Sequence, residues 1–169
     1  MVAATHYAPA MHAVSASRRA SGFTIVEVLI VVAIAGTLAA IAIPRYADYR
    51  ERIKVAQAVI DLRALSLLIN NYQLDARNYP PNLASVGNAG KLDPWGRPYV
   101  YLNLQDPALK GKGQARKNKN LVPINSDFDL YSVGKDGDSA GPLTAGKSRD
   151  DVIRANDGGF IGLARDYEP

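Results

Sequence analysis

The sequence predicts an α+β fold in which one long N-terminal helix packs on a small antiparallel β-sheet. Two observations carry this prediction. Helix-compatible residues run from about residue 23 to about residue 75, and segments rich in β-branched and aromatic residues follow only after that run. A single helix followed by short strands is typical of the α+β class rather than of alternating α/β folds. The chain has no cysteine, so a domain of this size must be stabilised by packing or by a bound metal.

The first part of the helix is apolar enough to cross a membrane. Between Phe23 and Ile43 the only charged residue is Glu27. A helix over this range would be roughly 32 Å long, close to the hydrocarbon thickness of roughly 30 Å. Because a carboxylate at such depth is costly unless it is paired, Glu27 is a candidate functional residue.

Two simpler interpretations of the apolar segment stay open. In the first, it is a secretory signal peptide with Arg18 and Arg19 as its basic region and Ala40-Ile41-Ala42 as its cleavage site. Glu27 interrupts that segment, and the apolar run exceeds the usual length of about 7–15 residues. In the second, it is a plain membrane anchor whose acid reaches the interface. Lysine and arginine occur on both sides of the segment, so charge does not decide its orientation.

The second part of the helix is expected to pack against the sheet. An apolar stripe recurs at steps of three and four residues and consists of Val55, Val59, Leu62, Leu65, Ile69 and Tyr72. A coiled coil is the alternative, but the stripe covers fewer than three heptads. The helix should end at about Leu74 or Asp75, because Pro80 and Pro81 follow shortly. Pro44 lies inside the pattern and predicts a kink.

Three segments have the composition of strands, namely 98–102, 128–133 and 158–163. Residues 105–120 between the first two are polar and basic, and we interpret them as a solvated loop. They contain no aromatic residue that could stack on a base, so they do not predict nucleic-acid binding. The formal charge of +4 falls to +2 without residues 1–22, which contain Arg18 and Arg19 and no acid, so the charge indicates no nucleic-acid partner either.

A cluster of aspartates follows the second predicted strand. Asp136 and Asp138 lie in a glycine-containing turn, and Asp150 and Asp151 come after a glycine-rich stretch that would allow the chain to fold back. Calcium takes six to eight oxygen ligands from carboxylates, carbonyls and water, so the cluster is a candidate calcium site. The alternative is ordinary turn chemistry, in which aspartate side chains bond their own backbone. The cluster has no glutamate in the closing position of an EF-hand loop.

Enzymatic activity is not expected. Both histidines, His6 and His12, precede the apolar segment, and no cysteine is present, so the remaining chain can form neither a histidine-based triad nor a zinc site built on these residues. A metal-dependent hydrolase on a tethered domain is the alternative from a different class of function. It would need an open coordination position and a general base, and the sequence displays neither.

The start of the helix resembles the class III signal of type IV pilins and pseudopilins. The residues that carry the resemblance are Gly22, Phe23, Thr24, Glu27 and Pro44. It implies cleavage after Gly22 by a prepilin peptidase, N-methylation of Phe23, and pairing of Glu27 with the N-terminal amine of a neighbouring subunit. The implied organisation is a leader over residues 1–22, a transmembrane and filament-core helix over 23–44, and a globular periplasmic domain over 45–169.

Later motifs resemble the major pseudopilin of type II secretion systems. These motifs are Tyr72-Gln73-Leu74-Asp75 with Asn78-Tyr79-Pro80, Asp93-Pro94-Trp95-Gly96-Arg97-Pro98-Tyr99, Asp129-Leu130-Tyr131-Ser132-Val133-Gly134 with Asp136-Gly137, and Asp150-Asp151-Val152-Ile153. The resemblance implies a pilin-like fold and one calcium ion held by Asp136, Asp150 and Asp151, with the backbone carbonyl of Val133 as a further ligand. Because the gap between Asp136 and Asp150 is longer than in the family loop, Asp138 or Asp157 is the alternative for one of these ligands. The loop 105–120 and the long gap between Asp136 and Asp150 depart from the family pattern.

The same resemblance implies the partners. They are further copies of the chain in a helical filament, the prepilin peptidase, an inner-membrane assembly platform and minor pseudopilins. The subunit would cross the bacterial inner membrane once, with its globular domain in the periplasm, and would support protein export without catalysing a reaction. A type IV pilin for adhesion or twitching is the alternative within this structural class.

Trp95 is expected to cover an edge of the core and to need one partner for its indole nitrogen.

Overall fold

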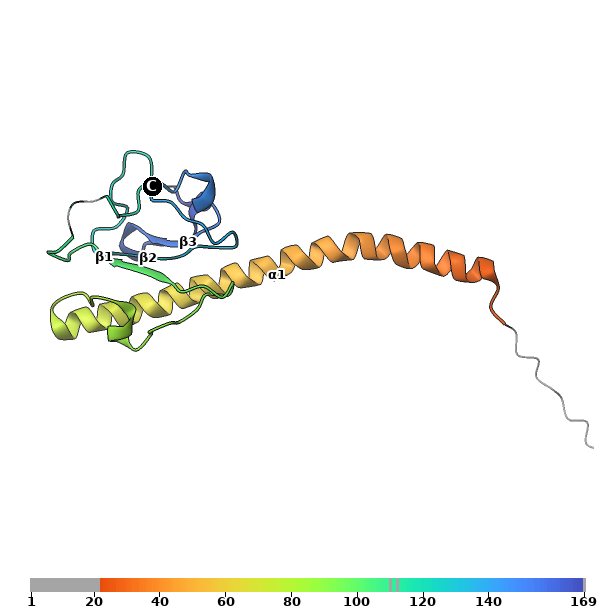
Figure 1. The fold of residues 1–169 in the computed structure, drawn as a ribbon, viewed down its shortest axis with the longest axis horizontal. Coiled ribbons are helices and arrows are strands. Elements are labelled where there is room, and N and C mark those ends of the chain that lie inside the picture. Colours follow the sequence, from red (N-terminus) through yellow and green to blue (C-terminus); the bar gives the residue numbers. More distant parts are fainter. Residues whose placement is uncertain (1–21, 110, 112, 169) are drawn as a thin grey trace, which may run out of the picture. The chain divides into compact units, whose positions relative to one another are not determined.

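The computed structural model describes residues 22–109, 111 and 113–168. These residues form one α-helix, α1 (Ile25–Ala76), and four strands, β1 (Val100–Asn103), β2 (Phe128–Ser132), β3 (Val152–Ala155) and β4 (Phe160–Leu163), shown in Figure 1. Short 3-10 turns lie at Leu83–Val86, Gly146–Ser148, Asn156–Gly158 and Ala164–Asp166. The strands pair in chain order in one antiparallel sheet. The predicted α+β class is confirmed.

The chain divides into two compact units, Met1–Ile43 and Pro44–Pro169, and α1 contributes to both. In the first unit the described part of the helix is apolar on all sides, and Ile25, Leu29, Ile34 and Ile41 are each more than half exposed. The described residues contain one helix that is long and apolar enough to cross a membrane. A helix with apolar side chains all round requires lipid or other helices as its surroundings.

The bounds of α1 agree with the predicted ones within two residues. The helix ends at Ala76, close to the expected end at Leu74 or Asp75, and Pro80 and Pro81 follow it. Pro44 lies inside the helix, which continues on both sides of it. The expected kink at Pro44 stays a prediction.

The three predicted strands are present, but one strand of the sheet was not predicted. β1, β2 and β4 fall within the segments 98–102, 128–133 and 158–163, apart from one residue at the end of β1. β3 lies between β2 and β4, with Tyr131 opposite Ile153 and Val152 opposite Leu163. Its four residues are all buried and include Arg154. Without alternation of apolar and polar residues, and with a charge inside it, such a segment has no strand pattern.

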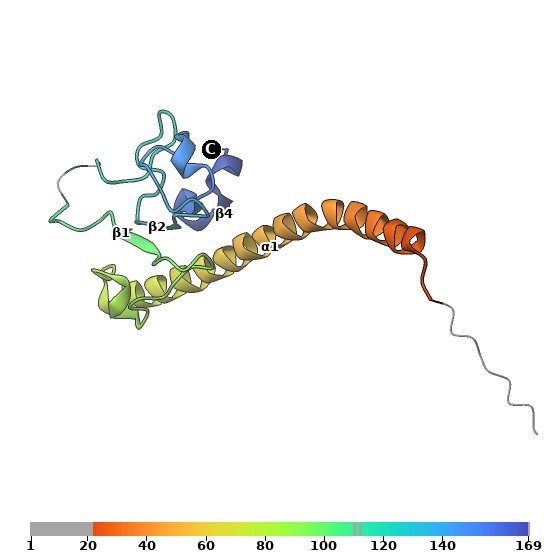
Figure 2. The same ribbon diagram turned by 45° about the vertical axis from the view of Figure 1, so that its right-hand side comes forward.

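One face of the sheet packs on the second half of α1, as the views in Figures 1 and 2 both show. The predicted stripe is confirmed, since the stripe residues Leu62, Leu65 and Ile69 are fully buried. This core consists of Ala58, Leu62, Leu65, Ile69, Tyr99, Phe128, Leu130 and Val152. A second buried cluster covers the other face of the sheet, and it consists of Ile124, Leu143, Ile153, Ala155, Ala164 and Tyr167. Loop residues such as Ile124 and Leu143 therefore form a second layer on this face of the sheet.

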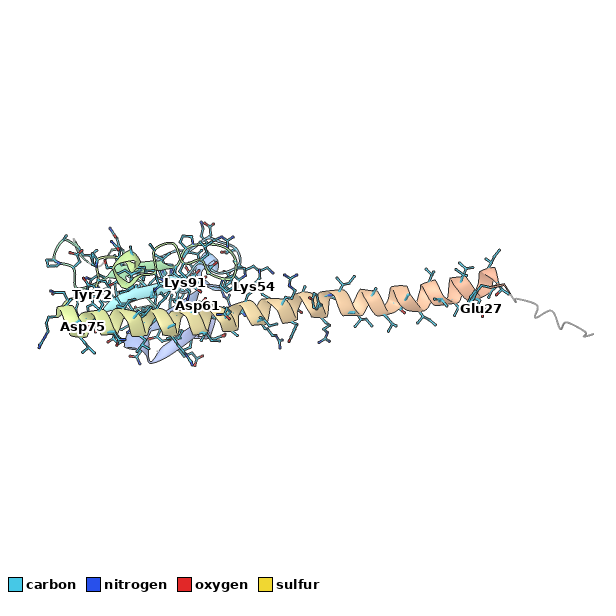
Figure 3. All side chains as sticks on the ribbon, turned by 90° about the horizontal axis from the view of Figure 1, so that it is seen from below. Glu27, Lys54, Asp61, Tyr72, Asp75 and Lys91 are labelled. Atoms are coloured by element: carbon cyan, nitrogen blue, oxygen red, sulfur yellow. The ribbon has the colours of Figure 1, made fainter. Side chains whose placement is uncertain are left out.

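Polar contacts fix the segment after α1 to the helix. The Tyr99 hydroxyl donates a hydrogen bond to Asp61, at 2.9 Å. The Lys91 ammonium lies 3.0 Å from the same carboxylate, and Figure 3 labels Lys91 and Asp61. Trp95 donates from its indole nitrogen to Glu51, at 2.8 Å. The expectation that Trp95 needs one partner is confirmed. This hydrogen bond fixes the turn that contains Trp95 to α1.

Candidate functional site

The helix start contains the first set of predicted site residues. Thr24 precedes the first helical residue, and its hydroxyl accepts a hydrogen bond from the backbone nitrogen of Glu27, at 3.2 Å. The Glu27 carboxylate accepts in return from the backbone nitrogen of Thr24, at 3.4 Å. This reciprocal pair is a capping box, which satisfies two backbone donors that the helix leaves unpaired. The Thr-x-x-Glu spacing is the sequence signal that could have predicted it.

The surroundings of Gly22 and Phe23 place no steric demand on either residue. No atom lies within 4 Å of a Cβ added at Gly22, and the side chain of Phe23 is 82% exposed. A glycine is needed where φ is positive or where another group approaches closely. Neither reason applies to Gly22 within the described part of the chain. Its presence therefore calls for an explanation outside the fold.

The aspartate loop, which we define as residues 133–151 between β2 and β3, contains the second set of predicted site residues. Asp150 accepts a hydrogen bond from the backbone nitrogen of Asp136, at 2.9 Å. Asp136 accepts in turn from the backbone nitrogen of Asp138, at 2.8 Å. The carboxylate of Asp138 lies 3.2 Å from the Lys147 ammonium, and both side chains are mostly exposed. Asp136 thus makes the local turn contact that its residue type favours, whereas Asp150 joins two distant parts of the loop and Asp138 forms an exposed ion pair.

Asp151 differs from the other three because its side chain is fully buried. Its Oδ2 accepts hydrogen bonds from Arg116 and from the Ser139 hydroxyl, both at 2.6 Å. Its Oδ1 is buried without a hydrogen-bond partner. Burial raises the pKa of Asp151 to about 6, although the Ser139 hydrogen bond and the Arg116 charge act in the opposite direction. Of these two partners, Ser139 belongs to the aspartate loop and Arg116 comes from residues 105–120.

The four aspartates do not converge on one point. Among the described residues no group of three or more His, Cys, Asp and Glu side chains lies close enough to hold a metal ion. Val133, whose carbonyl the resemblance implies as a ligand, directly follows β2. Calcium binding by Asp136, Asp150 and Asp151, with Asp138 as a substitute, stays a prediction.

Arg97 belongs to the family motif 93–99, but the sequence predicted no role for it in this region. Its guanidinium donates to the carbonyl of Gly134, at 2.7 Å, and to that of Lys135, at 3.3 Å. Asp93 accepts from the backbone nitrogens of Trp95 and Arg97, at 3.0 and 2.9 Å, which fixes the turn that presents Arg97. The Asp-Pro-Trp-Gly motif was available as a signal for the turn, but not for its contact with the aspartate loop.

The basic loop 105–120 is only partly solvated, and the prediction is wrong for its second half. Ala115, Arg116 and Asn118 are buried, with exposed fractions of 1, 3 and 4%. The backbone nitrogen of Arg116 donates to Asp129 of β2, at 2.7 Å. Burial raises the pKa of Asp129, against the effect of the hydrogen bonds from Arg116 and Asn125. The neighbours of Asp129 in β2, Phe128 and Leu130, belong to the core that packs on α1. Because Asp129 alternates with them, Arg116 lies over the sheet face that points away from α1.

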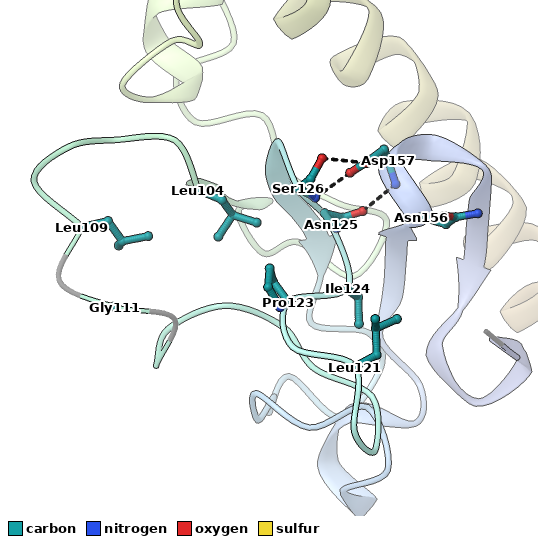
Figure 4. Close-up of a pocket in the computed structure, with 10 residues that line it drawn as sticks. All are labelled: Leu104, Leu109, Gly111, Leu121, Pro123, Ile124, Asn125, Ser126, Asn156 and Asp157. Carbon is teal, nitrogen blue, oxygen red and sulfur yellow. Dashed lines mark hydrogen bonds between the residues drawn. The ribbon is translucent and has the colours of Figure 1, made fainter.

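A pocket of about 540 Å³ lies beside the first half of this loop (Figure 4). Its apolar lining comes from Leu104, Leu109, Leu121, Pro123 and Ile124. On its polar side, Asp157 accepts hydrogen bonds from the backbone nitrogen and the hydroxyl of Ser126, at 2.7 and 2.8 Å. The lining contains no histidine or cysteine and no arrangement of acid and base that would support a reaction.

Comparison with known proteins assigns the chain to a family. Residues 17–43 match the model of the prokaryotic N-terminal methylation motif. The chain is 33% identical over 145 residues to the type II secretion system core protein G of Pseudomonas aeruginosa. The match covers 73% of this chain and 89% of that protein. The chain belongs to the core protein G family. The same protein of Aeromonas hydrophila is 30% identical over 143 residues, which are 72% of this chain and 87% of that one.

Members of the core protein G family are not the only relatives. The fimbrial protein of Neisseria meningitidis serogroup A is 29% identical over 136 residues, which are 80% of this chain and 79% of that protein. No solved structure matches the chain. The core protein G family therefore provides the assignment, and the fimbrial similarity marks a wider relationship that includes pilins. As a core protein G family member with the methylation motif and an apolar N-terminal helix, this chain is a membrane-anchored subunit of pilin type.

Proposed function

We propose that this chain is the major pseudopilin of a type II secretion system, a structural subunit that assembles into a periplasmic filament and supports protein export. The observation that carries the proposal is the helix start, where Gly22, Phe23 and Glu27 stand at the mouth of an apolar helix within the matched methylation motif. The identity to core protein G over most of that protein's length supports the type II assignment. No step of this function requires catalysis.

Processing at the leader accounts for Gly22. Nothing in the described chain requires a glycine there, so the residue is explained by a peptidase that accepts a glycine before the cleaved bond. We propose cleavage after Gly22 and methylation of Phe23 by a prepilin peptidase in the inner membrane. The globular domain, residues 45–169, would then lie in the periplasm.

Assembly follows from the surface of the first unit. The apolar side chains of the helix are exposed all round, and lipid covers them before assembly. In the filament, helices of neighbouring copies would replace the lipid, and the assembly platform and minor pseudopilins would start the process. Repeated head-to-tail contacts whose rotation does not close produce an open filament. The Glu27 carboxylate would pair with the amine of Phe23 in an adjacent subunit, which offsets both charges in an apolar setting.

A type IV pilin for adhesion or twitching is the second candidate. The observation that favours it is the match to the fimbrial protein of Neisseria meningitidis, which covers 80% of this chain. The two candidates share processing, anchoring and assembly. They differ in the location of the filament, in the periplasm or on the cell surface, and in the process that its loss abolishes, protein export or adhesion and twitching.

The experiment has two parts. Mass spectrometry of the protein from membranes should give a chain that starts at methylated Phe23, whereas a chain starting near Ile43 would indicate simple secretion. Deletion of the gene should abolish export of secreted proteins and leave surface pili and twitching intact. Loss of surface pili with normal export would identify a pilin instead.

A further inference from the structure

The second half of the basic loop lies directly alongside the aspartate loop. The backbone nitrogen of Lys117 donates to the Gly141 carbonyl, at 3.0 Å, and that of Leu143 donates to the Lys117 carbonyl, at 2.8 Å. Lys117 and Pro142 therefore form one parallel β-bridge between the two loops. Two of the departures from the family pattern, the additional basic loop and the long gap between Asp136 and Asp150, meet at this point.

Arg116 reaches from this pairing into the aspartate loop. Its side chain is 3% exposed and that of Asp151 is 0% exposed. The guanidinium donates to Asp151, at 2.6 Å, to the carbonyl of Ala140, at 2.8 Å, and to the Ser139 hydroxyl. Its Cζ lies 4.3 Å from the centre of the Tyr131 ring, close enough for a cation–π contact. Four groups of the protein thus surround one buried positive charge.

The geometry points to Arg116 as the resident cation of the aspartate loop, in the role that a divalent cation would otherwise fill. A buried carboxylate requires a compensating charge, and Arg116 supplies one with good hydrogen-bond geometry. The guanidinium comes from the same chain, so the loop is ordered on folding and does not depend on the calcium concentration outside the cytoplasm. This role does not depend on whether the filament is a pseudopilus or a pilus.

Other oxygen atoms of the loop that could coordinate a cation also have partners, whereas Asp151 Oδ1 is buried without one. Arg97 holds the carbonyls of Gly134 and Lys135. Asp150 and Asp136 accept backbone hydrogen bonds, and Asp138 lies beside Lys147. Calcium needs six to eight oxygens, and a second cation next to the Arg116 guanidinium would be repelled by it. The donor set therefore fits a loop fixed by two guanidinium groups better than a calcium site.

The test uses the full processed chain, purified in detergent, with thermal unfolding followed by the fluorescence of Trp95, its only tryptophan. The midpoint of the unmodified protein should be the same in excess EDTA and in millimolar calcium, and calorimetric titration with calcium should release no binding heat. Saturable calcium binding that raises the midpoint would overturn the proposal and establish the calcium site of the aspartates instead.

Variants test the role of the guanidinium. Arg116→Gln should lower the midpoint by roughly 10 °C, because it leaves Asp151 buried without a countercharge. Arg149→Gln is the matched control, since it makes the same change at an exposed arginine next to Asp150, and it should leave the midpoint unchanged. The double variant Arg116→Gln with Asp151→Asn should lose less than the sum of the two single variants. Additive losses would contradict the pairing. If Arg116→Gln does not fold, the calcium titration of the unmodified chain still decides.

Discussion

Arg154 donates two parallel hydrogen bonds to Asp127, at 2.8 and 2.6 Å, and its guanidinium lies over the ring of Phe128, with Cζ 4.0 Å from the ring centre. The side chains of Arg154 and Asp127 are 2 and 11% exposed. Together with Arg116 and Asp151, this pair gives the domain two buried arginine–aspartate contacts. In a small domain without disulfides, these contacts join β3 and the aspartate loop to distant parts of the chain.

Arg154→Met should lower the free energy of unfolding by about 3–5 kcal/mol, because it leaves the Asp127 carboxylate buried and unpaired. Denaturant titration of the full chain in detergent would measure the loss. Arg165→Met is the control, since Arg165 and Asp166 form an exposed contact at 3.8 Å, and such pairs contribute about 0–1 kcal/mol. The prediction fails if both variants lose the same small amount.

Gly134→Ala should lower stability by about 1–3 kcal/mol. Gly134 has a φ of +66°, and a Cβ added there would collide with the backbone carbonyl of Asp150. Both the conformation and the close approach therefore require a glycine. Gly146→Ala offers a control in the same loop, because no atom lies within 4 Å of its added Cβ and its φ is not positive. Thermal unfolding of both variants would compare them, and equal midpoints would disprove the collision.

Asp157 should contribute stability that is lost in acid. Partial burial acts to raise the pKa of Asp157, but the hydrogen bonds from Ser126 outweigh it and lower that pKa below 3.8, its ordinary value (Figure 4). A lowered folded-state pKa gives stability that is present above the unfolded-state pKa and lost as the pH falls through the folded-state pKa. The loss is therefore expected below about pH 4.

Asp157→Asn is the variant that measures this contribution. Asparagine accepts the positive φ of this position but cannot ionise, so the variant should lose less stability between neutral pH and pH 3 than the unmodified chain does. Thermal unfolding at a series of pH values would show the difference. Parallel pH curves for the two proteins would mean that Asp157 titrates alike in the folded and unfolded states.

The helix, the strands β1, β2 and β4, and the helix-facing core could be predicted because their signals are local. The stripe through Leu62, Leu65 and Ile69 repeats at helical spacing, and strands such as β2 have a recognisable composition. The need of Trp95 for a partner was equally readable. Its identity was not, since Glu51 lies 44 positions away in the sequence.

The contacts of the aspartate loop could not be predicted for the same reason. Arg116 and Asp151 are 35 positions apart, and Arg116 stands among lysines, glycines and asparagines that indicate a solvated loop. Composition assigns one environment to the whole segment, whereas the fold buries one of its cations and exposes others. β3 was missed because Arg154 interrupts its apolar residues, and only the tertiary partner Asp127 makes that arginine acceptable in a buried strand.

Glu27→Gln separates the charge of this residue from its capping role. Glutamine at this position of a capping box still accepts from the backbone nitrogen of Thr24, so the helix should start as before and the subunit should still enter the membrane. Without the negative charge, however, the amine of Phe23 in a neighbouring copy has no counterion in an apolar setting. Incorporation into filaments should therefore be lost, as measured by immunoblots of membrane and sheared-filament fractions.

Thr24→Ala is the matched control, because it changes the capping box and leaves the charge of Glu27 in place. It removes the hydroxyl that accepts from the backbone nitrogen of Glu27, which costs about 1 kcal/mol of helix stability, and it keeps the carboxylate. Filaments should form from this variant and not from Glu27→Gln. If both variants assemble, the carboxylate acts as a helix cap alone, and docking of subunits depends on the apolar helix surface. If both fail to assemble, the geometry of the helix start is what the neighbouring subunit recognises.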